Sequence, residues 1–386
     1  MTAFLLLATA LVAEEVWQSK GSTHFYSLEY DEAVAEFEKE IAANAADAGA
    51  RNRLAQALLY RELYRAGALE SELVSGANPF LRREKMEPKP ADLAKLDGAI
   101  AQAMTVAQNA ISKNPQDARA YYALAVAHGL RGNAGFLIRK TYMDALRDAT
   151  QSRKYAQRAL ELEPGYVDPK IIQALHEYIV ASLPFYMRMV GFLAGFHGDK
   201  EGGIRTLQML AEKGHGVKID AAIMLGIIYR RERKPLEAIP ILLDLVQKFP
   251  RNFLFRLEQV QMYSDAGDKG KAVAVLDEVD RLKKAGTPGY ERISYEKLAY
   301  VRGNVLFWYR EFDAAIAQLK TATAKANELD LHSAVMSWLR LGQAYDSKGQ
   351  RAEAVAAYKM AVQTAPQSEA AKEAKRYQGS RYIRVD

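Results

Sequence analysis

The chain has 386 residues, 49% of them apolar, and can therefore bury a large hydrophobic interior. Its 53 basic and 47 acidic residues give a formal net charge of +6 and are interleaved, which is typical of a solvated surface and not of a nucleic-acid-binding patch. The absence of cysteine excludes disulfides, thiolate nucleophiles and zinc sites built on sulfur.

Residues 1–13 form an apolar leader that we expect to be a secretory signal peptide. The stretch from Thr2 to Ala13 is too short to cross a bilayer as a helix, and two glutamates follow it at once. Small residues at Ala8 and Ala10, or at Ala13, fit a cleavage site. We therefore expect a secreted or periplasmic protein. A membrane-anchored or cytoplasmic protein is the alternative, because no basic residue precedes the apolar stretch.

Residues 14–66 are expected to form N-terminal helical hairpins. Small and large side chains there fall at spacings that recur later in the chain, namely Trp17, Gly21, His24, Ala33 and Phe37. Residues 67–98 follow, with Pro79, Pro88 and Pro90 among mixed charges. Prolines at this density interrupt helices, so the stretch predicts a long insertion on one face of the molecule.

Residues 99–218 are expected to form irregular helices. Within them, residues 179–196 are apolar except for Arg188 and are broken by Pro184. Two interpretations are open for this segment: a helix buried among the others, or an interfacial helix that touches a bilayer or lines a lipid-sized pocket. After a glycine-rich turn, Asp199 is expected to cap a helix over residues 200–213.

Residues 219–375 carry the clearest internal repeat, with a period of about 34 residues. The most complete unit is marked by Trp338, Leu341, Gly342, Tyr345, Ala354, Tyr358, Ala361 and Pro366, and a second by Leu225, Gly226, Tyr229, Ala238 and Pro250. Small residues let two antiparallel helices cross closely, and large ones fill the remaining space. Residues 376–386 are expected to be a helix end followed by a short extended tail.

This pattern, W-x2-L-G-x2-Y followed by A, an aromatic residue, A and P, resembles the tetratricopeptide repeat family. The resemblance implies an all-α fold: an α-solenoid of antiparallel helical hairpins that coils into a right-handed superhelix. The irregular insertions favour a partly closed superhelix over a uniform one. Residues 182–204 are similar to a stretch of the eukaryotic inclusion-body-clearance proteins, which are also built on tetratricopeptide hairpins.

The resemblance also implies that fixed positions on the first helix of each hairpin face a concave groove that binds a partner. In this chain those positions are Tyr122, Ile223, Ile227, Arg230, Arg231, Leu257, Gln261, Lys297, Tyr300, Asn304, Phe307, Trp308, Leu339 and Gln343. Apolar side chains among them suit an extended or helical peptide, and Arg230, Arg231 and Lys297 favour acidic groups nearby. The alternative is that several of them pack against a neighbouring helix or a folded-back segment.

The function expected from the sequence is a non-enzymatic scaffold that binds a protein or peptide, with no cofactor and no metal. The six histidines are scattered singly, and no motif brings a nucleophile together with a base. Lipid or apolar-ligand binding through residues 179–196, with contact to a membrane, is the first alternative. An enzyme with an unrecognised site is the second. No nucleic-acid partner is expected.

Overall fold

The computed structural model describes residues 16–69, 86–183 and 197–384, and all regular secondary structure in these ranges is helical. Helices adjacent in sequence pack as antiparallel hairpins. The pairs are α1 (Lys20–Tyr26) with α2 (Tyr30–Ala43), α3 (Ala48–Arg65) with α5 (Pro90–Lys113), α6 (Ala118–Ala134) with α7 (Tyr142–Leu162), and α8 (Lys170–Ala181) with α10 (Lys200–Lys213). They continue with α11 (Lys218–Arg231) and α12 (Pro235–Lys248), α13 (Phe253–Asp265) and α14 (Lys269–Lys284), α15 (Tyr295–Trp308) and α16 (Phe312–Ala324), and α17 (Leu331–Ser347) and α18 (Arg351–Thr364). The final helix, α19 (Glu369–Gly379), packs on the last pair.

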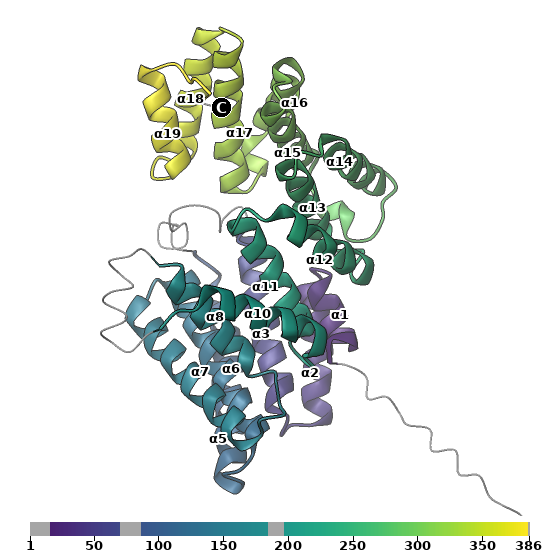
Figure 1. The fold of residues 1–386 in the computed structure, drawn as a ribbon, viewed down its shortest axis with the longest axis vertical. Helices are drawn as coiled ribbons and strands as arrows, with labels where there is room; N and C mark the ends of the chain where they lie inside the picture. Colours follow the sequence, from purple (N-terminus) through teal and green to yellow (C-terminus); the bar gives the residue numbers. More distant parts are fainter. Residues whose placement is uncertain (1–15, 70–85, 184–196, 385–386) are drawn as a thin grey trace, which may run out of the picture.

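The expected α-solenoid of antiparallel hairpins is therefore confirmed. Figure 1 shows the helices from α1 to α11 gathered in one half of the molecule and those from α13 onward in the other, with α12 between them. Single short turns lie at Val16–Gln18, Gly135–Arg139, Tyr290–Arg292 and Ala326–Glu328. No helix in the described ranges is long and apolar enough to cross a bilayer.

Several helix starts follow from capping residues in the sequence. The Asp199 side chain accepts a hydrogen bond from the backbone N–H of Gly202, which confirms the predicted cap of α10. Asp47 and Asp117 cap α3 and α6 in the same way. Pro90 occupies the first turn of α5, where the missing N–H costs no hydrogen bond. The insertion expected over residues 67–98 therefore ends earlier than predicted, before Pro90.

Close crossing at glycine recurs in three hairpins. A Cβ atom at Gly21 would lie 2.4 Å from the ring of Phe37, one at Gly303 would lie 2.7 Å from Leu319, and one at Gly342 would lie 2.4 Å from the ring of Tyr358. In each hairpin the large side chain comes sixteen positions after the glycine. The glycine thus opens the space that the large side chain of the second helix fills, as the repeat pattern predicted.

The superhelix folds back so that the first hairpin contacts the region around α13. Nδ2 of Asn252 donates a hydrogen bond to the carbonyl oxygen of Tyr26 at 2.7 Å, 226 residues earlier in the chain. Arg292 donates to the carbonyl of Leu28, and the rings of Tyr26 and Phe249 lie 5.0 Å apart. The first hairpin is therefore packed on the segments around α13, so the expected partial closure is confirmed.

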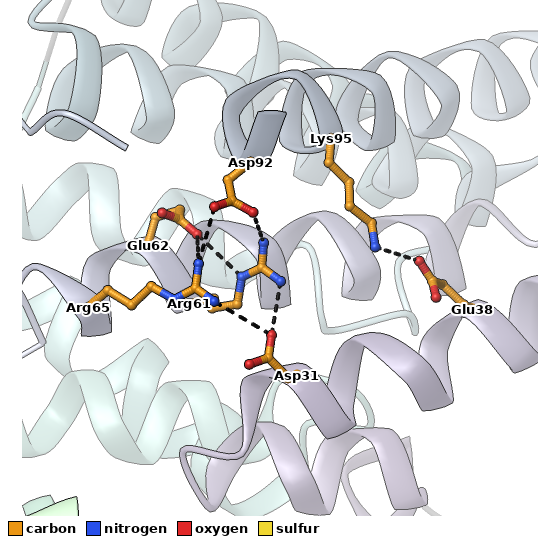
Figure 2. A network of polar contacts seen from close by, with 7 residues as sticks. All are labelled: Asp31, Glu38, Arg61, Glu62, Arg65, Asp92 and Lys95. Atoms are coloured by element: carbon orange, nitrogen blue, oxygen red, sulfur yellow. Dashed lines mark hydrogen bonds and ion pairs between the residues drawn. The ribbon is translucent and has the colours of Figure 1, made fainter. Parts of the chain in front are cut away.

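A network of polar contacts ties α2, α3 and α5 together (Figure 2). The side chain of Arg61, only 10% exposed, donates to Asp31 at 2.9 Å and to Asp92 at 2.8 Å. Its Nε also lies 3.3 Å from Oε1 of the buried Glu62. One planar guanidinium thus satisfies carboxylates from three helices and fixes the rotation of α5 against the first hairpins.

The apolar segment at residues 179–196 falls mostly outside the described residues. Helix α8 ends at Ala181, and Ile179 near that end is 56% exposed. The predictions that residues 184–196 pack inside the superhelix or contact lipid, like the leader at residues 1–13, lie outside the part of the chain that the structure describes.

Candidate functional site

The first helices of four hairpins converge on one interior region, which we call the inner recess: Tyr26 of α1, Gln56 and Tyr60 of α3, Tyr122 of α6 and Asp220 of α11. The hydroxyl of Tyr26 donates a hydrogen bond to Oδ1 of Asp220 at 3.1 Å. Gln56, Tyr60, Tyr122 and Asp220 are only half-buried, although protein surrounds the recess on most sides. Solvent therefore still reaches these side chains between the surrounding helices, and the binding of a partner by Tyr122 stays a prediction.

Burial raises the pKa of Asp220 to about 6, and the nearby charge of Asp168 adds to this effect. Hydrogen bonds from Tyr26 and Gln56 offset only part of it. Desolvation and the carboxylates of Asp168 and Asp220 likewise raise the pKa of Tyr122. A carboxylate held in such surroundings is destabilising in the folded protein, and groups of this kind concentrate at binding sites.

Asp220→Asn is expected to stabilise the protein at neutral pH. Because the pKa of Asp220 is higher in the folded chain than in the unfolded chain, the folded state takes up the proton first. The stabilisation that protonated Asp220 gives the folded chain is therefore fully present below about pH 4, and it is lost as the pH rises through about 6. The variant should gain about 2 kcal/mol of unfolding free energy at pH 7 and nothing at pH 4.

Urea denaturation between pH 4 and pH 8 measures this difference. Asp244→Asn is the control, since its side chain is 51% exposed on α12, and it should stay within about 0.5 kcal/mol of the unsubstituted chain at every pH. Equal pH profiles for the two variants would contradict the assignment.

The cations predicted to attract acidic groups are mostly neutralised inside the molecule. Arg230 donates to both oxygens of Glu258, at 2.8 and 2.9 Å, and its side chain is 9% exposed. Lys297 pairs with Asp330 at 3.1 Å and is 8% exposed. Arg231 alone of the three is exposed. The predicted preference for acidic ligands is thus corrected for Arg230 and Lys297, because each cation already has a carboxylate.

The predicted groove residues of the C-terminal hairpins are more buried than expected. Four have almost no exposed surface, namely Tyr300, Phe307, Leu339 and Gln343, while Leu257 and Asn304 are also buried. Ile223, Ile227 and Gln261 remain half-buried, and Trp308 is 38% exposed. The prediction that these six buried side chains are exposed in a groove is therefore wrong for the folded chain. Their binding of a partner stays a prediction that requires a covering segment to move.

Neighbouring helices and the chain end provide this cover. Arg340 of α17 lies over the rings of Phe307, at 5.3 Å, and Trp308, at 4.6 Å, and its Nε donates to Asn304. Gln343 donates to Glu373 of α19 at 3.1 Å. Residues 380–384, which we call the tail, continue from α19 without helical structure and contact the same surface. The folded-back segment left open as an alternative is thus present.

A second, shallow depression lies between α7, α8 and the start of α10. Nη1 of Arg153 lies 2.8 Å from Nε2 of His176, and burial together with this cation lowers the pKa of the histidine. Glu177 and His197 also line it. The depression offers polar contacts but is open to solvent. Among the described residues, no group of three histidine or acidic side chains could hold a metal ion.

Comparison with known protein families gives one match, in the C-terminal half of the chain. Residues 300–369 match the model of the tetratricopeptide repeat. A search of the curated proteins found no match. Solved structures similar in fold include yeast Tom70 (TM-score 0.40, 13% identity, covering 94% of this chain and 89% of that one) and Cut9 in the Cut9–Hcn1 hetero-tetramer of the APC/C (0.38, 12%, 93% and 74%). A human IFIT1 dimer with PPP-AAAA is also similar (0.31, 16%, 90% and 91%).

Proposed function

We propose that this chain, whose residues 300–369 belong to the tetratricopeptide repeat family and whose helices form the corresponding hairpins, is a non-enzymatic scaffold that binds a segment of a partner protein on its concave side. The repeat fold supports a protein-binding role in general. The inner recess is the observation that carries the more specific proposal.

Three properties of the recess support it as a binding site. Its side chains come from the first helices of separate hairpins, so a ligand there contacts several repeats at once. Tyrosine rings supply flat amphipathic surface at a small cost in side-chain entropy. Asp220 supplies a carboxylate that folding alone disfavours. A basic side chain of the partner would pair with this carboxylate and stack on the rings, which stabilises both groups.

Site-specific photocrosslinking tests the proposal. A photoreactive amino acid in place of Tyr122 should form an adduct with a protein partner in cells, while the same amino acid in place of Lys154, exposed on the second helix α7, should not. Asp220→Asn should reduce the adduct at least about fivefold, because about 1 kcal/mol of charge pairing is lost, and Asp244→Asn should leave it unchanged. Equal adducts from positions 122 and 154 would reject the recess as the site.

We also propose that residues 1–13 direct export to the cell envelope, on the strength of their apolar composition and short length. The amino-terminal sequence of the protein isolated from cells tests this. Export with cleavage predicts a first residue directly after Ala10 or Ala13, and a chain that retains residues 1–13 would contradict it.

A further inference from the structure

The tail holds an extended conformation across the ends of two first helices. Ser380, which ends α19, has φ −132° and ψ 140°, typical of an extended strand. The backbone N–H of Tyr382 donates to Oδ2 of Asp346 at 2.8 Å, and the guanidinium of Arg381 donates to the carbonyl oxygen of the same residue. The tail is thus fixed to the end of α17 by its main chain as well as by its side chains.

From Tyr382 to Arg384 the side chains alternate between the protein and solvent, whereas Arg381 before them also contacts Asp346. The ring of Tyr382 lies 6.1 Å from that of Phe307 and 5.2 Å from that of Tyr377. Ile383 is 75% exposed. Arg384 returns to the surface, donates to the carbonyl of Trp308 at 2.9 Å and lies 5.2 Å from its ring. This is the period of two that an extended peptide shows when it binds a surface through every second residue.

The surface beneath the tail coincides with predicted partner-binding positions. Phe307 has no exposed surface with the tail in place, while Trp308 keeps 38%. Arg340 lies over both rings from the side of α17. An aromatic pair with a cation above it and backbone carbonyls beside it is therefore already shaped for an extended segment.

The contacts that hold the tail are each weak, namely surface hydrogen bonds, ring contacts and one cation–π contact. One aromatic ring and a handful of hydrogen bonds at the surface oppose the conformational entropy lost when these residues are ordered. A segment held in this way opens readily, and its tether returns it at an effective concentration of roughly millimolar. A partner segment with similar side chains can therefore compete with the tail for the same contacts.

We propose that the tail is a tethered occupant of a second peptide-binding surface, formed by Phe307, Trp308 and Asp346, and that it is displaced by an extended partner segment with an aromatic residue two positions before an arginine. This inference rests on the proposed scaffold function but uses a surface separate from the inner recess. The tail thereby raises the partner concentration needed to occupy this surface.

Fluorescence anisotropy with a defined probe tests the inference. The probe is a labelled peptide of residues 380–384, Ser-Arg-Tyr-Ile-Arg, with both ends blocked. A chain that stops at Gly379, and so keeps α19, should bind it, while the full chain should bind it at least about tenfold more weakly because its own tail competes. The probe with alanine in place of its tyrosine should bind neither chain.

Two point variants of the full chain make the result independent of truncation. Tyr382→Ala removes the half-buried ring that packs on Phe307 and should strengthen probe binding towards that of the shortened chain. Ile383→Ala alters the exposed neighbour and should bind as the full chain does. If the Tyr382→Ala chain, with unchanged helicity, binds no better than the Ile383→Ala chain, the proposal is wrong. A full-length dimer that is lost on truncation would also overturn it, since the tail would then occupy a second copy.

The anisotropy result for the tail peptide can be distinguished from the crosslinking result that tests the scaffold proposal. Crosslinking from position 122 reports on the inner recess and does not depend on the tail. Probe binding with no crosslink would retain the tail surface and reject the recess, and a crosslink with no probe binding would do the reverse.

Discussion

Asp346→Ala is expected to lower the unfolding free energy by about 3 kcal/mol, the loss typical of breaking a buried charged network. Asp346 has no exposed surface. Both its carboxylate oxygens accept from Arg351 at 3.0 Å, and one also accepts from the hydroxyl of Tyr358 at 2.9 Å. Burial and this hydrogen bond raise the pKa of Tyr358 well above its usual value, so the phenol remains a donor. Alanine would leave that hydroxyl buried without an acceptor.

The matched control is Asp313→Ala in the preceding hairpin. Asp313 pairs with Lys348 at 2.9 Å, but its side chain is 81% exposed, so its removal should cost less than about 0.5 kcal/mol. Urea denaturation followed by circular dichroism measures both. Because Asp346 also accepts from the N–H of Tyr382, its substitution should loosen the tail and should remove the same hydrogen bond from a bound tail peptide. Equal costs for the two variants would contradict the role assigned to Asp346.

Gly342→Ala is expected to destabilise the last hairpin by about 3 kcal/mol through overpacking. The new Cβ would lie 2.4 Å from the ring of Tyr358. That ring has no exposed surface, and its hydroxyl is held by Asp346, so it has no room to move aside. The two helices would have to separate, which removes contacts along the whole crossing.

Gly226→Ala is the control, because this glycine occupies the same position of the repeat in α11. No atom lies within 4 Å of the Cβ that alanine would add there. Alanine should therefore raise the unfolding free energy by about 0.5–1 kcal/mol through its higher helix propensity. Opposite signs in thermal and urea denaturation are the expected result. Similar values would show that the close approach at Gly342 does not decide its stability.

The hairpins were predictable because their signals are local. Asp199 caps α10 by accepting from a residue only three positions later. Gly342 and Tyr358 lie on two helices of one hairpin, so a short loop fixes their separation in the sequence. Helix caps and contacts within one hairpin depend only on neighbouring segments, so the periodicity of the sequence predicts them.

The cover over the groove was not predictable, because it depends on segments distant in sequence. Periodicity marks Phe307 as facing inward but cannot say that Tyr382, 75 positions later, packs on it. The pairing of Arg230 with Glu258, which removes its charge from the groove, depends on how two hairpins sit side by side. Residues 381–384 read Arg-Tyr-Ile-Arg, and no periodicity in them predicts that the tail contacts protein.

The contact between α1 and the region around Arg292 affects how the chain can fold during synthesis. Arg292 lies 264 residues after its acceptor Leu28, and at 5–20 residues per second it is made roughly 13–53 s later. Until then the face of the first hairpin around Tyr26 lacks the side chains that bury it in the finished protein. A growing chain therefore exposes this apolar face for most of its translation, so the amino-terminal hairpin is a segment that a chaperone would protect until Arg292 is made.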